Sequence, residues 1–367
     1  MKLVVINPIL YTNETQNIKK VNSIKDTMIY NLCLEFKRDG HEPILISSKD
    51  YEPIVDKNYD FKIIFLESKF QRIFKPNCFP LLSKLGKTLK KECGEFDLII
   101  SSEVFMMSSL YVSMKYKNKT IIWHELAKHN NILKKIPSKF WYNIIARIFF
   151  RNTRIVARSK NAQDFIRNYC NNVSDIYIDH GVSLDEFEYS KQKQHQFVVV
   201  SQLIKRKHID GIIMAFMDFL KNSVDYKLYI IGSGDEEENL KSLVTDQYAE
   251  NILFLGQMSH YEIIPVLSKS MALVINTEKD NNMLSIVEAI ATATPIITTD
   301  IPYNVDYIKK NHLGVVTTSV SKFDFEMILK NLDMYVDNCV KYRECVSNHY
   351  HINQFLEELR LLQEAKR

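Results

Sequence analysis

Short runs of apolar residues recur along the chain, separated by segments with helical spacing. Seven runs lie in the first half, at 3–8, 42–48, 61–68, 96–102, 120–125, 154–159 and 175–181, and six in the second, at 196–203, 226–234, 251–256, 271–277, 295–300 and 313–318. Such strands, alternating with helices, are typical of parallel sheets covered on both faces. Thirteen strands are too many for one comfortable open sheet, so the pattern predicts an α/β protein with two doubly wound, Rossmann-like parallel-sheet domains facing a cleft.

A polar stretch marks the expected boundary between these domains. Residues 188–196 read EYSKQKQHQ and precede a fresh strand. We therefore expect an N-terminal acceptor-binding domain at 1–190 and a C-terminal donor-binding domain at 191–345. Ligands of open parallel sheets bind outside the carboxyl ends of the strands, so the loops after the strands are where site residues are sought.

The last segment, 346–367, has the spacing of an amphipathic helix and is expected to pack back on the N-terminal domain. Its apolar stripe comprises Ile352, Phe355, Leu359 and Leu362.

One carboxylate stands alone in an apolar helix of the second half. Residues 280–295 read DNNMLSIVEAIATATP, and Glu288 is the only charged residue between Leu284 and Ala293. A buried carboxylate needs hydrogen-bond donors, because desolvating it alone costs several kcal/mol. A ribose diol supplies two hydroxyl donors, and the first amides of a helix suit a phosphate.

This segment therefore predicts a nucleotide site. Glu288 would bind the ribose, and Asp280 would reach beyond the phosphates. An alternative remains open, in which Asp280 caps the helix, as Asn281 or Asn282 also could, and Glu288 pairs with a basic side chain. The turn expected at the phosphates comprises Asn282, Met283 and Leu284.

Two further loops lead to the same edge of the second sheet. Lys205, Arg206 and Lys207 follow one strand and would neutralise a diphosphate, unless they form an ordinary solvated turn. Gly232 and Gly234 follow the next strand and would let the backbone approach a ligand. The third glycine of a dinucleotide fingerprint is missing, which argues against NAD.

In the first half, two strand ends carry polar side chains. His124 closes one strand, and we expect it to face the cleft, although a structural histidine is the alternative. The HELAKH sequence almost matches a zinc-binding H-E-x-x-H motif, but His129 comes one residue late and would lie on another face. Ser102 and Glu103 end another strand, where Glu103 could orient an acceptor hydroxyl.

Charge is distributed unevenly, although the net charge is only +4. Residues 128–163 contain nine Lys or Arg and no acid, and residues 68–91 contain seven and no acid. Aromatic and apolar residues are interleaved, which suits an anionic membrane surface better than nucleic acid. A solvated basic face over ordinary core helices is the alternative.

Composition places the chain in a cytoplasmic setting. Six scattered cysteines without a close pair indicate reduced thiols. No apolar run is long enough to span a membrane, and the start reads as a first strand rather than a signal peptide.

Together these motifs resemble the retaining glycosyltransferases of family 4, which have the GT-B fold. Asp280 and Glu288 have the spacing of the family's acid-x7-Glu motif, and EAIATATPIITTD resembles the run that follows it. SQLIKRKHID resembles the segment that places a lysine, here Lys207, on the donor diphosphate. IIGSGDEEENL and DHGVSLDEF resemble two further family segments. The resemblance covers residues 155–316 well and the first 125 residues in outline.

Three positions depart from the family pattern. Gln202 stands where an arginine usually pairs with the diphosphate, Asp280 replaces the commoner glutamate, and Thr294 replaces a glycine. Lys205 or Arg206 would have to substitute for the missing arginine, or phosphate binding would be weaker.

The resemblance implies a retaining transfer of a sugar from a nucleoside-diphosphate sugar, by default a UDP-sugar, to a hydroxyl of a glycan or lipid-linked glycan in bacterial surface-glycan synthesis. His124, Asp280 and Lys207 would be catalytic, with the enzyme peripheral to the inner face of the cell membrane. No cofactor or metal is expected, because no D-x-D motif stands in the cleft loops. Three alternatives remain: a sugar-nucleotide 2-epimerase, an inactive nucleotide-sugar-binding subunit and a nucleic-acid-binding protein.

Overall fold

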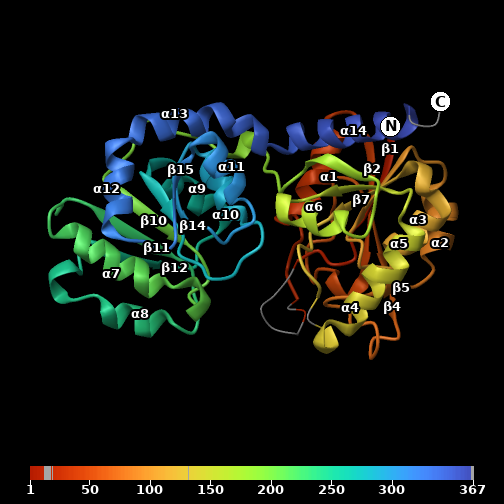
Figure 1. Cartoon of the computed structure of the whole chain (residues 1–367), viewed down its shortest axis with the longest axis horizontal. Coiled ribbons are helices and arrows are strands. Elements are labelled where there is room, and N and C mark those ends of the chain that lie inside the picture. Colours follow the sequence, from red (N-terminus) through yellow and green to blue (C-terminus); the bar gives the residue numbers. More distant parts are fainter. Residues whose placement is uncertain (12–17, 19, 131, 365–367) are drawn as a thin grey trace. The chain divides into compact units, whose positions relative to one another are not determined.

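The computed structural model describes residues 1–11, 18, 20–130 and 132–364. It divides the chain into two compact units (Figure 1). Unit 1 combines Met1–Asp179 with the C-terminal segment that starts at Asn348, and unit 2 is His180–Ser347.

Unit 1 is built on a parallel sheet of seven strands. The alternation of side chains along β1 places Leu3 and Val5 in the core on one face of the sheet, and Val4 and Ile6 in the core on the other. In sheet order the strands are β3 (Lys62–Leu66), β2 (Glu42–Ser48), β1 (Lys2–Ile6), β6 (Leu98–Ser102), β7 (Thr120–His124), β8 (Arg154–Ala157) and β9 (Val173–Tyr177).

Helices cover both faces of this sheet. α1 (Met28–Arg38) and α14 (Asn348–Glu364) contribute to the core of one face. The core of the other face receives residues from α2 (Leu85–Thr88), α3 (Met107–Tyr116), α6 (Lys160–Arg167) and the helical region 136–150. That last region comprises α4 (Ile136–Phe140), a π-helical stretch (Trp141–Ala146) and α5 (Arg147–Phe149). The short strands β4 (Ser68–Lys69) and β5 (Leu81–Leu82) form an antiparallel pair that the sequence pattern did not predict.

Unit 2 has a parallel sheet of six strands with helices on both sides. In sheet order these are β12 (Ile252–Gly256), β11 (Lys227–Ile231), β10 (Gln196–Val200), β13 (Ala272–Val274), β14 (Ile296–Thr299) and β15 (Gly314–Thr317). The helices are α7 (Ile209–Leu220), α8 (Glu237–Leu243), α9 (His260–Lys269), α10 (Leu284–Ala291), α11 (Val305–Asn311), α12 (Lys322–Lys330) and α13 (Leu332–Tyr342).

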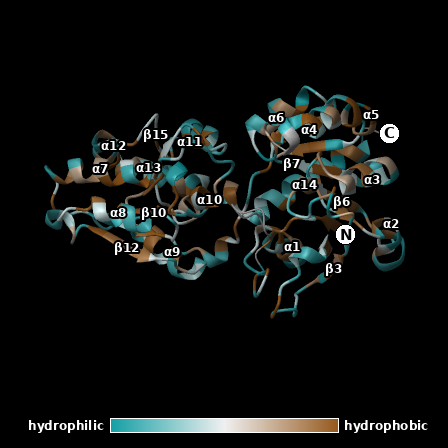
Figure 2. Ribbon diagram, turned by 90° about the horizontal axis from the view of Figure 1, so that it is seen from below, coloured by the Kyte–Doolittle hydropathy of each residue, from teal (hydrophilic) through white to brown (hydrophobic). Residues whose placement is uncertain are grey.

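These two doubly wound sheets confirm the predicted fold class, since each of the thirteen apolar runs overlaps one of their strands. Figure 2 shows hydrophobic residues in the strands of both units, while the helices carry both hydrophobic and hydrophilic residues. Among the described residues, no helix is long and apolar enough to cross a bilayer. All six cysteines are free thiols.

The division between the units differs from the expected boundary at 190/191, since it falls after Asp179. Residues that follow Asp179 are tied to unit 2, because Val182 forms a parallel bridge with Ser347 and Arg343 donates to the carbonyl oxygens of Leu184 and Phe187. At the other end, α14 begins at Asn348, and its predicted apolar stripe is buried in unit 1.

Candidate functional site

In unit 2 the strand order reverses between β10 and β13, and the loops after these two strands carry the predicted site residues. Ligands of doubly wound sheets bind at this switch point, outside the carboxyl ends of the strands. A small pocket opens here, and its lining includes Ser201, Lys207, Asn276 and Met283. The fold therefore brings the basic turn and the start of the 280–295 segment to the expected edge.

Asp280 joins the two loops by ion pairs. Its Oδ2 accepts from Lys207 Nζ at 2.7 Å and from Thr277 Oγ1 at 2.6 Å. Its Oδ1 accepts from Arg206 Nη1 at 3.1 Å. Lys207 is buried and the Asp280 side chain is only 14% exposed, so the pair is shielded from solvent screening. Asp280 therefore holds the ends of Lys207 and Arg206 beside the pocket.

The turn after β10 holds these cations in place. Lys205–Lys207 form a single 3-10 turn, and His208 follows with a φ of 45° at the N-cap of α7. The amide of Glu278 donates to the carbonyl oxygen of Arg206 at 3.0 Å, which fastens the turn to the loop after β13. Gln202 and Lys205 lie on the same turn and are exposed.

The start of α10 differs from the alternative in which a residue at 280–282 caps the helix. The N-cap is Met283, not Asp280, Asn281 or Asn282. Asn304 holds it through both groups of its amide, since Oδ1 accepts from Met283 N at 3.3 Å and Nδ2 donates to Met283 O at 3.0 Å. Asp280 is drawn away from the helix end by its two cations. Asn282 is half-buried and Leu284 is exposed.

Glu288 is buried, and it pairs with a residue that the sequence did not single out. Its Oε1 lies 3.1 Å from Nδ1 of His260, the first residue of α9. The His260 side chain is 31% exposed, and its ring packs edge-on against Phe187. The Glu288 carboxylate, which was predicted to bind a ribose, therefore faces the start of α9 and contacts Nδ1 of His260.

The two glycines after β11 are required by close backbone packing, which their sequence pattern did not predict. A Cβ atom at Gly232 would lie 1.8 Å from the carbonyl oxygen of Ser201, and one at Gly234 would lie 2.3 Å from that of Leu203. Gly232 also has a φ of 137°. The close approach is to the loop after β10, so these glycines shape that loop.

In unit 1, β6 and β7 end beside each other and bring Glu103 and His124 together. His124 is fully buried, and its Nδ1 lies 2.6 Å from Oε1 of Glu103. Phe165 stacks on the ring with centroids 6.2 Å apart. The Nε2 atom makes no hydrogen bond with any residue that the structure describes.

Glu103 has a φ of 67°, and both of its carboxylate oxygens are engaged inside the unit. Burial alone would raise its pKa, but the charge and hydrogen bond of His124 and backbone amides lower the pKa to about 2. The carboxylate is held by donors from three segments of unit 1, whereas the sequence suggested that it could orient an acceptor hydroxyl. Besides His124, its donors are the amides of Phe105, Glu125 and Leu126 and the hydroxyl of Tyr142, at 3.1 to 3.2 Å.

Two further polar residues of this region, Ser102 and His129, have contacts inside unit 1. The carbonyl oxygen of Ser102 accepts from Ser109 Oγ at 3.0 Å. His129 lies 3.2 Å from Ser138 Oγ and 3.2 Å from Tyr169 OH. Among the described residues, no three His, Cys, Asp or Glu side chains gather as metal ligands would.

Sequence reasoning missed His260, Thr277 and Tyr142. A signal existed for the first, since Ser259 and Glu262 form a capping box that marks the start of α9 at a strand end. Thr277 ends the predicted strand 271–277, where a hydroxyl beside the basic turn could have been noted.

Residues 184–349 match the family described as "Glycosyl transferases group 1". The GtfA subunit of the UDP-N-acetylglucosamine–peptide N-acetylglucosaminyltransferase of Streptococcus pneumoniae serotype 4 is 28% identical over 142 residues, which cover 38% of this chain and 28% of that protein. Alpha-monoglucosyldiacylglycerol synthase of Streptococcus pneumoniae is 21% identical over 318 residues, 79% of this chain and 71% of that protein. The matches span about a third or less of the first curated relatives.

The solved structure of Anabaena HepE in complex with UDP superposes with a TM-score of 0.67 at 12% identity, covering 98% of this chain and 100% of the other. Likeness at this identity establishes the fold, and the family match covers the segment that holds Lys207, Asp280 and Glu288. Residues 184–349 therefore resemble the group 1 glycosyl transferases, and the chain has the GT-B fold, with two Rossmann-like units.

Proposed function

We propose that this protein transfers a sugar from a nucleoside-diphosphate sugar, by default a UDP-sugar, to a hydroxyl of a glycan or lipid-linked glycan, with retention at the anomeric carbon. The observation that carries the proposal is the pairing of Lys207 and Arg206 with Asp280 at the switch point of unit 2. UDP in the HepE structure and the UDP-sugar in the name of GtfA support the choice of donor.

In this proposal the cations of unit 2 neutralise the leaving group. As the bond from sugar to phosphate breaks, negative charge grows on the diphosphate, and preorganised cations stabilise it where it develops. Lys207 and Arg206 share Asp280, so a diphosphate bound there would take over part of their hydrogen bonding. Asp280 would then be available to a hydroxyl of the transferred sugar, and no metal ion is assigned a role.

Glu288 would bind the ribose hydroxyls, and the start of α10 would lie at the phosphates. Asn282, Met283 and Leu284 belong to that start, and Gln202 and Lys205 border it on the turn after β10. Gly232 and Gly234 would act through the shape of that turn, not by direct contact.

His124 is proposed to act near the transferred sugar through Nε2, because Nδ1 is committed to Glu103. The leaving phosphate would accept the proton of the attacking hydroxyl. Ser102 stands at the end of the neighbouring strand and remains a candidate for acceptor contact. The proposal requires His124 and Asp280 to act on the same sugar.

We place the enzyme at the inner face of the cell membrane, acting on surface-glycan intermediates. The support is the acid-free basic character of residues 68–91 and 128–163, both in unit 1. The name of alpha-monoglucosyldiacylglycerol synthase, a relative over most of this chain, is consistent with a lipid-type acceptor.

A melting-temperature screen against UDP, GDP, ADP, CDP and NAD tests the donor site. A ligand at about 100 times its dissociation constant adds roughly 2.7 kcal/mol to stability, which a melting curve resolves. One nucleoside diphosphate should raise the melting temperature of the wild type and not of Glu288→Ala. Stabilisation by NAD alone, or by no nucleotide, would contradict the proposal.

Turnover with the donor that binds tests the chemistry. Lys207→Ala should lower turnover by roughly a hundredfold or more, while Lys227→Ala, an exposed lysine at the start of β11, should leave it unchanged. Binding without turnover on any glycan acceptor would favour a nucleotide-sugar-binding subunit instead.

A further inference from the structure

An exposed apolar stripe runs along one side of unit 1. The helical run Ile136–Phe149 comprises α4, the π-helical stretch and α5. Residues four positions apart on a helix share a face, and four large apolar side chains of this run are exposed at that spacing. They are Ile136 at 67%, Phe140 at 57%, Ile144 at 43% and Ile148 at 62%.

The exposed stripe is not a sign of a loosely attached helix. The other face of the same run buries Trp141, Tyr142 and Ala146 in the core of unit 1. The indole nitrogen of Trp141 donates to the carbonyl oxygen of Val104 at 2.9 Å, which fastens the run to the loop after β6. The helix already has a core-facing side, so the apolar stripe exceeds what folding requires.

A basic stripe accompanies the apolar one. Lys135, Lys139 and Arg147 immediately precede Ile136, Phe140 and Ile148, and Arg151 continues the spacing. All four of these cationic residues are exposed, and no acid occurs between residues 128 and 163. The cations therefore form a row of one sign beside the apolar row.

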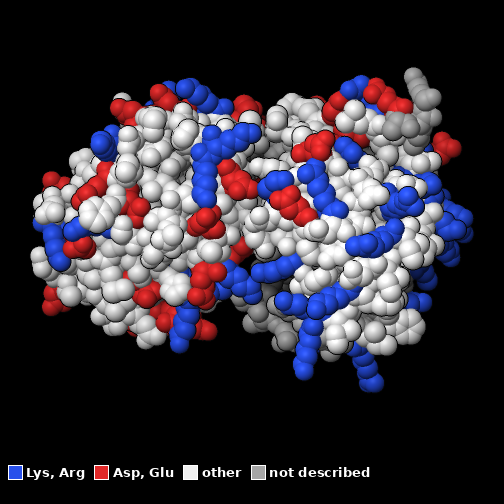
Figure 3. Space-filling view, viewed as in Figure 1, with Lys and Arg blue, Asp and Glu red and all other residues white. Residues whose placement is uncertain are grey.

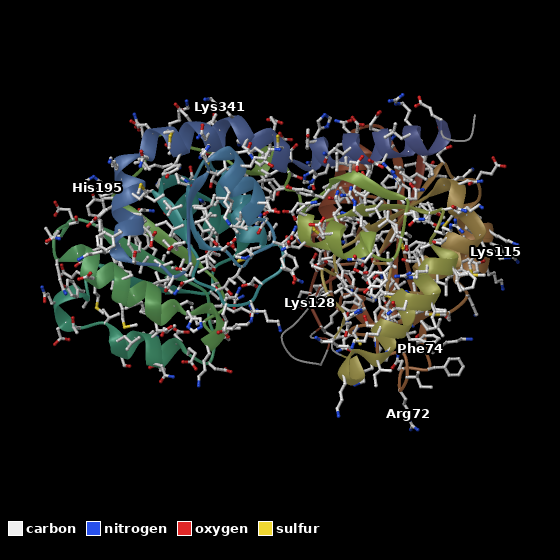
Figure 4. The ribbon with its side chains drawn as sticks, viewed as in Figure 1. Arg72, Phe74, Lys115, Lys128, His195 and Lys341 are labelled. Carbon is white, nitrogen blue, oxygen red and sulfur yellow. The ribbon has the colours of Figure 1, made fainter. Side chains whose placement is uncertain are left out.

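A second element adds to the same side of unit 1. The loop between β4 and β5 exposes Phe70 at 69% and Ile73 at 77%, next to Arg72. Phe79, at the end of this loop, packs edge-on against Trp141 with ring centroids 5.3 Å apart, so the loop and the helical run are neighbours. Figure 4 shows Arg72 and Phe74 at the edge of the unit, and Figure 3 shows Lys and Arg side chains prominent there.

We propose that this surface docks unit 1 on an anionic lipid bilayer. It consists of Phe70, Ile73, the four stripe residues and their flanking cations, and is called the docking face. The apolar side chains would enter the boundary between headgroups and acyl chains, while the cations contact anionic headgroups. This deepens the proposed function by naming the partner of unit 1. It rests on the proposed function only in giving the contact a role in glycan transfer.

The composition of the docking face favours a bilayer over nucleic acid. A single-stranded nucleic acid is bound by cations together with aromatic rings on which bases stack. Ile73, Ile136, Ile144 and Ile148 offer no stacking platform, and their aliphatic side chains gain by leaving water. An apolar row on one side of a helix, beside a row of cations, is typical of a helix that lies in a membrane interface.

Vesicle flotation of the full chain tests the proposal. The wild type should bind phosphatidylcholine vesicles that contain phosphatidylglycerol and should bind pure phosphatidylcholine poorly. The stripe variant, Ile136→Ser with Phe140→Ser, Ile144→Ser and Ile148→Ser, should lose about tenfold or more in partitioning. Lys135→Gln with Lys139→Gln and Arg151→Gln should lose binding mainly at low salt.

The matched control lies in unit 2. Met214, Phe323 and Met327 are exposed to a similar extent, at 53%, 66% and 46%. Their triple serine variant should bind vesicles as the wild type does. All variants should keep the wild-type melting temperature, because the replaced side chains are exposed.

Two results would overturn the proposal. In the first, the stripe variant binds anionic vesicles as tightly as the wild type does. In the second, the wild type ignores those vesicles but binds single-stranded RNA in a salt-dependent manner. The melting screen with UDP separates the two proposals, since vesicle binding without nucleotide binding would contradict the proposed function and leave the docking face supported.

Discussion

The Nδ1 atom of His124 lies 2.6 Å from Oε1 of Glu103, across the carboxyl ends of the neighbouring strands β7 and β6. Glu103 is held ionised, with its pKa lowered to about 2, so it accepts and Nδ1 must donate. In the neutral ring the other nitrogen then carries the lone pair. The relationship makes Glu103 a positioning residue, which acts on the proposed chemistry only through His124.

Replacing Glu103 with glutamine should impair turnover but not donor binding. Its amide group would face donors that now bind a carboxylate, so the His124 ring would lose its fixed tautomer. We expect turnover to fall on the order of a hundredfold, as orienting carboxylates of catalytic histidines show effects of this size or larger. The melting-temperature shift with UDP should be unchanged, since the donor residues belong to unit 2.

Nitrogen NMR of the imidazole supplies a readout that a merely structural role would not change. The wild type should show a protonated Nδ1, and Glu103→Gln should show a mixture of tautomers. Glu125→Gln is the matched control, because Glu125 directly follows His124 and its carboxylate pairs with Arg158 at 2.9 Å. Wild-type turnover in Glu103→Gln would refute the positioning role.

Glu103 should also make unit 1 sensitive to acid. Its pKa falls from 4.5 to about 2 on folding, because the charge and hydrogen bonds around it outweigh the effect of burial. The unfolded chain binds more protons in that range, so the stabilisation is present above pH 4.5 and is lost as the pH falls towards 2. A shift of this size corresponds to about 3 kcal/mol. The urea concentration at the midpoint of unfolding should fall less steeply with decreasing pH for Glu103→Gln than for the wild type. The same dependence on pH in both proteins would contradict the prediction.

Glu288 and His260 should both matter for nucleotide binding, to different degrees. Glu288→Gln removes the charge proposed to accept the ribose hydroxyls, so UDP affinity should fall by about tenfold or more. His260→Ala keeps the Glu288 carboxylate but removes the imidazole that contacts it, so a smaller loss of UDP affinity, roughly threefold, is expected. Isothermal titration with UDP measures both, with Glu326→Gln, an exposed carboxylate of α12, as the control. Equal affinities for all three variants would remove Glu288 from the site.

The sequence could predict the strands and the edge at which the loops gather, because both depend on local periodicity and on a general rule of parallel sheets. It could not predict which side chain each loop residue meets. Glu288 and His260 are in contact because α9 and α10 pack together, and no residue spacing in the sequence predicts that contact. Glu103 looked available for an acceptor because its amide donors come from backbone, which leaves no trace in residue types.

Composition also misplaced the boundary between the units. Residues 188–196 belong to unit 2, and all but Gln196 are exposed or half-buried, so this polar surface segment resembles a linker in composition. Lys193 shows how firmly this segment is attached. Its ammonium donates to the carbonyl oxygen of Ser268 at 2.8 Å and lies 3.4 Å from that of Thr292 and 3.3 Å from the hydroxyl of Thr294.

Lys193 should make unit 2 more stable as the pH rises. Burial lowers its pKa from 10.5 to about 8, so between these values the unfolded chain binds more protons than the folded one. The free energy of unfolding should therefore rise across this window, by about 3 kcal/mol, while the cost of burying the charge is fully present below pH 8. Lys193→Met should remove this rise, whatever it does to stability at pH 7. Thermal unfolding followed by circular dichroism across the window measures it, with Lys191→Met, whose lysine is exposed and paired with Asp337, as the control. Because tyrosines and cysteines also titrate there, the test is the difference between the variants, and the same pH dependence in wild type and Lys193→Met would show that this lysine is not the group responsible.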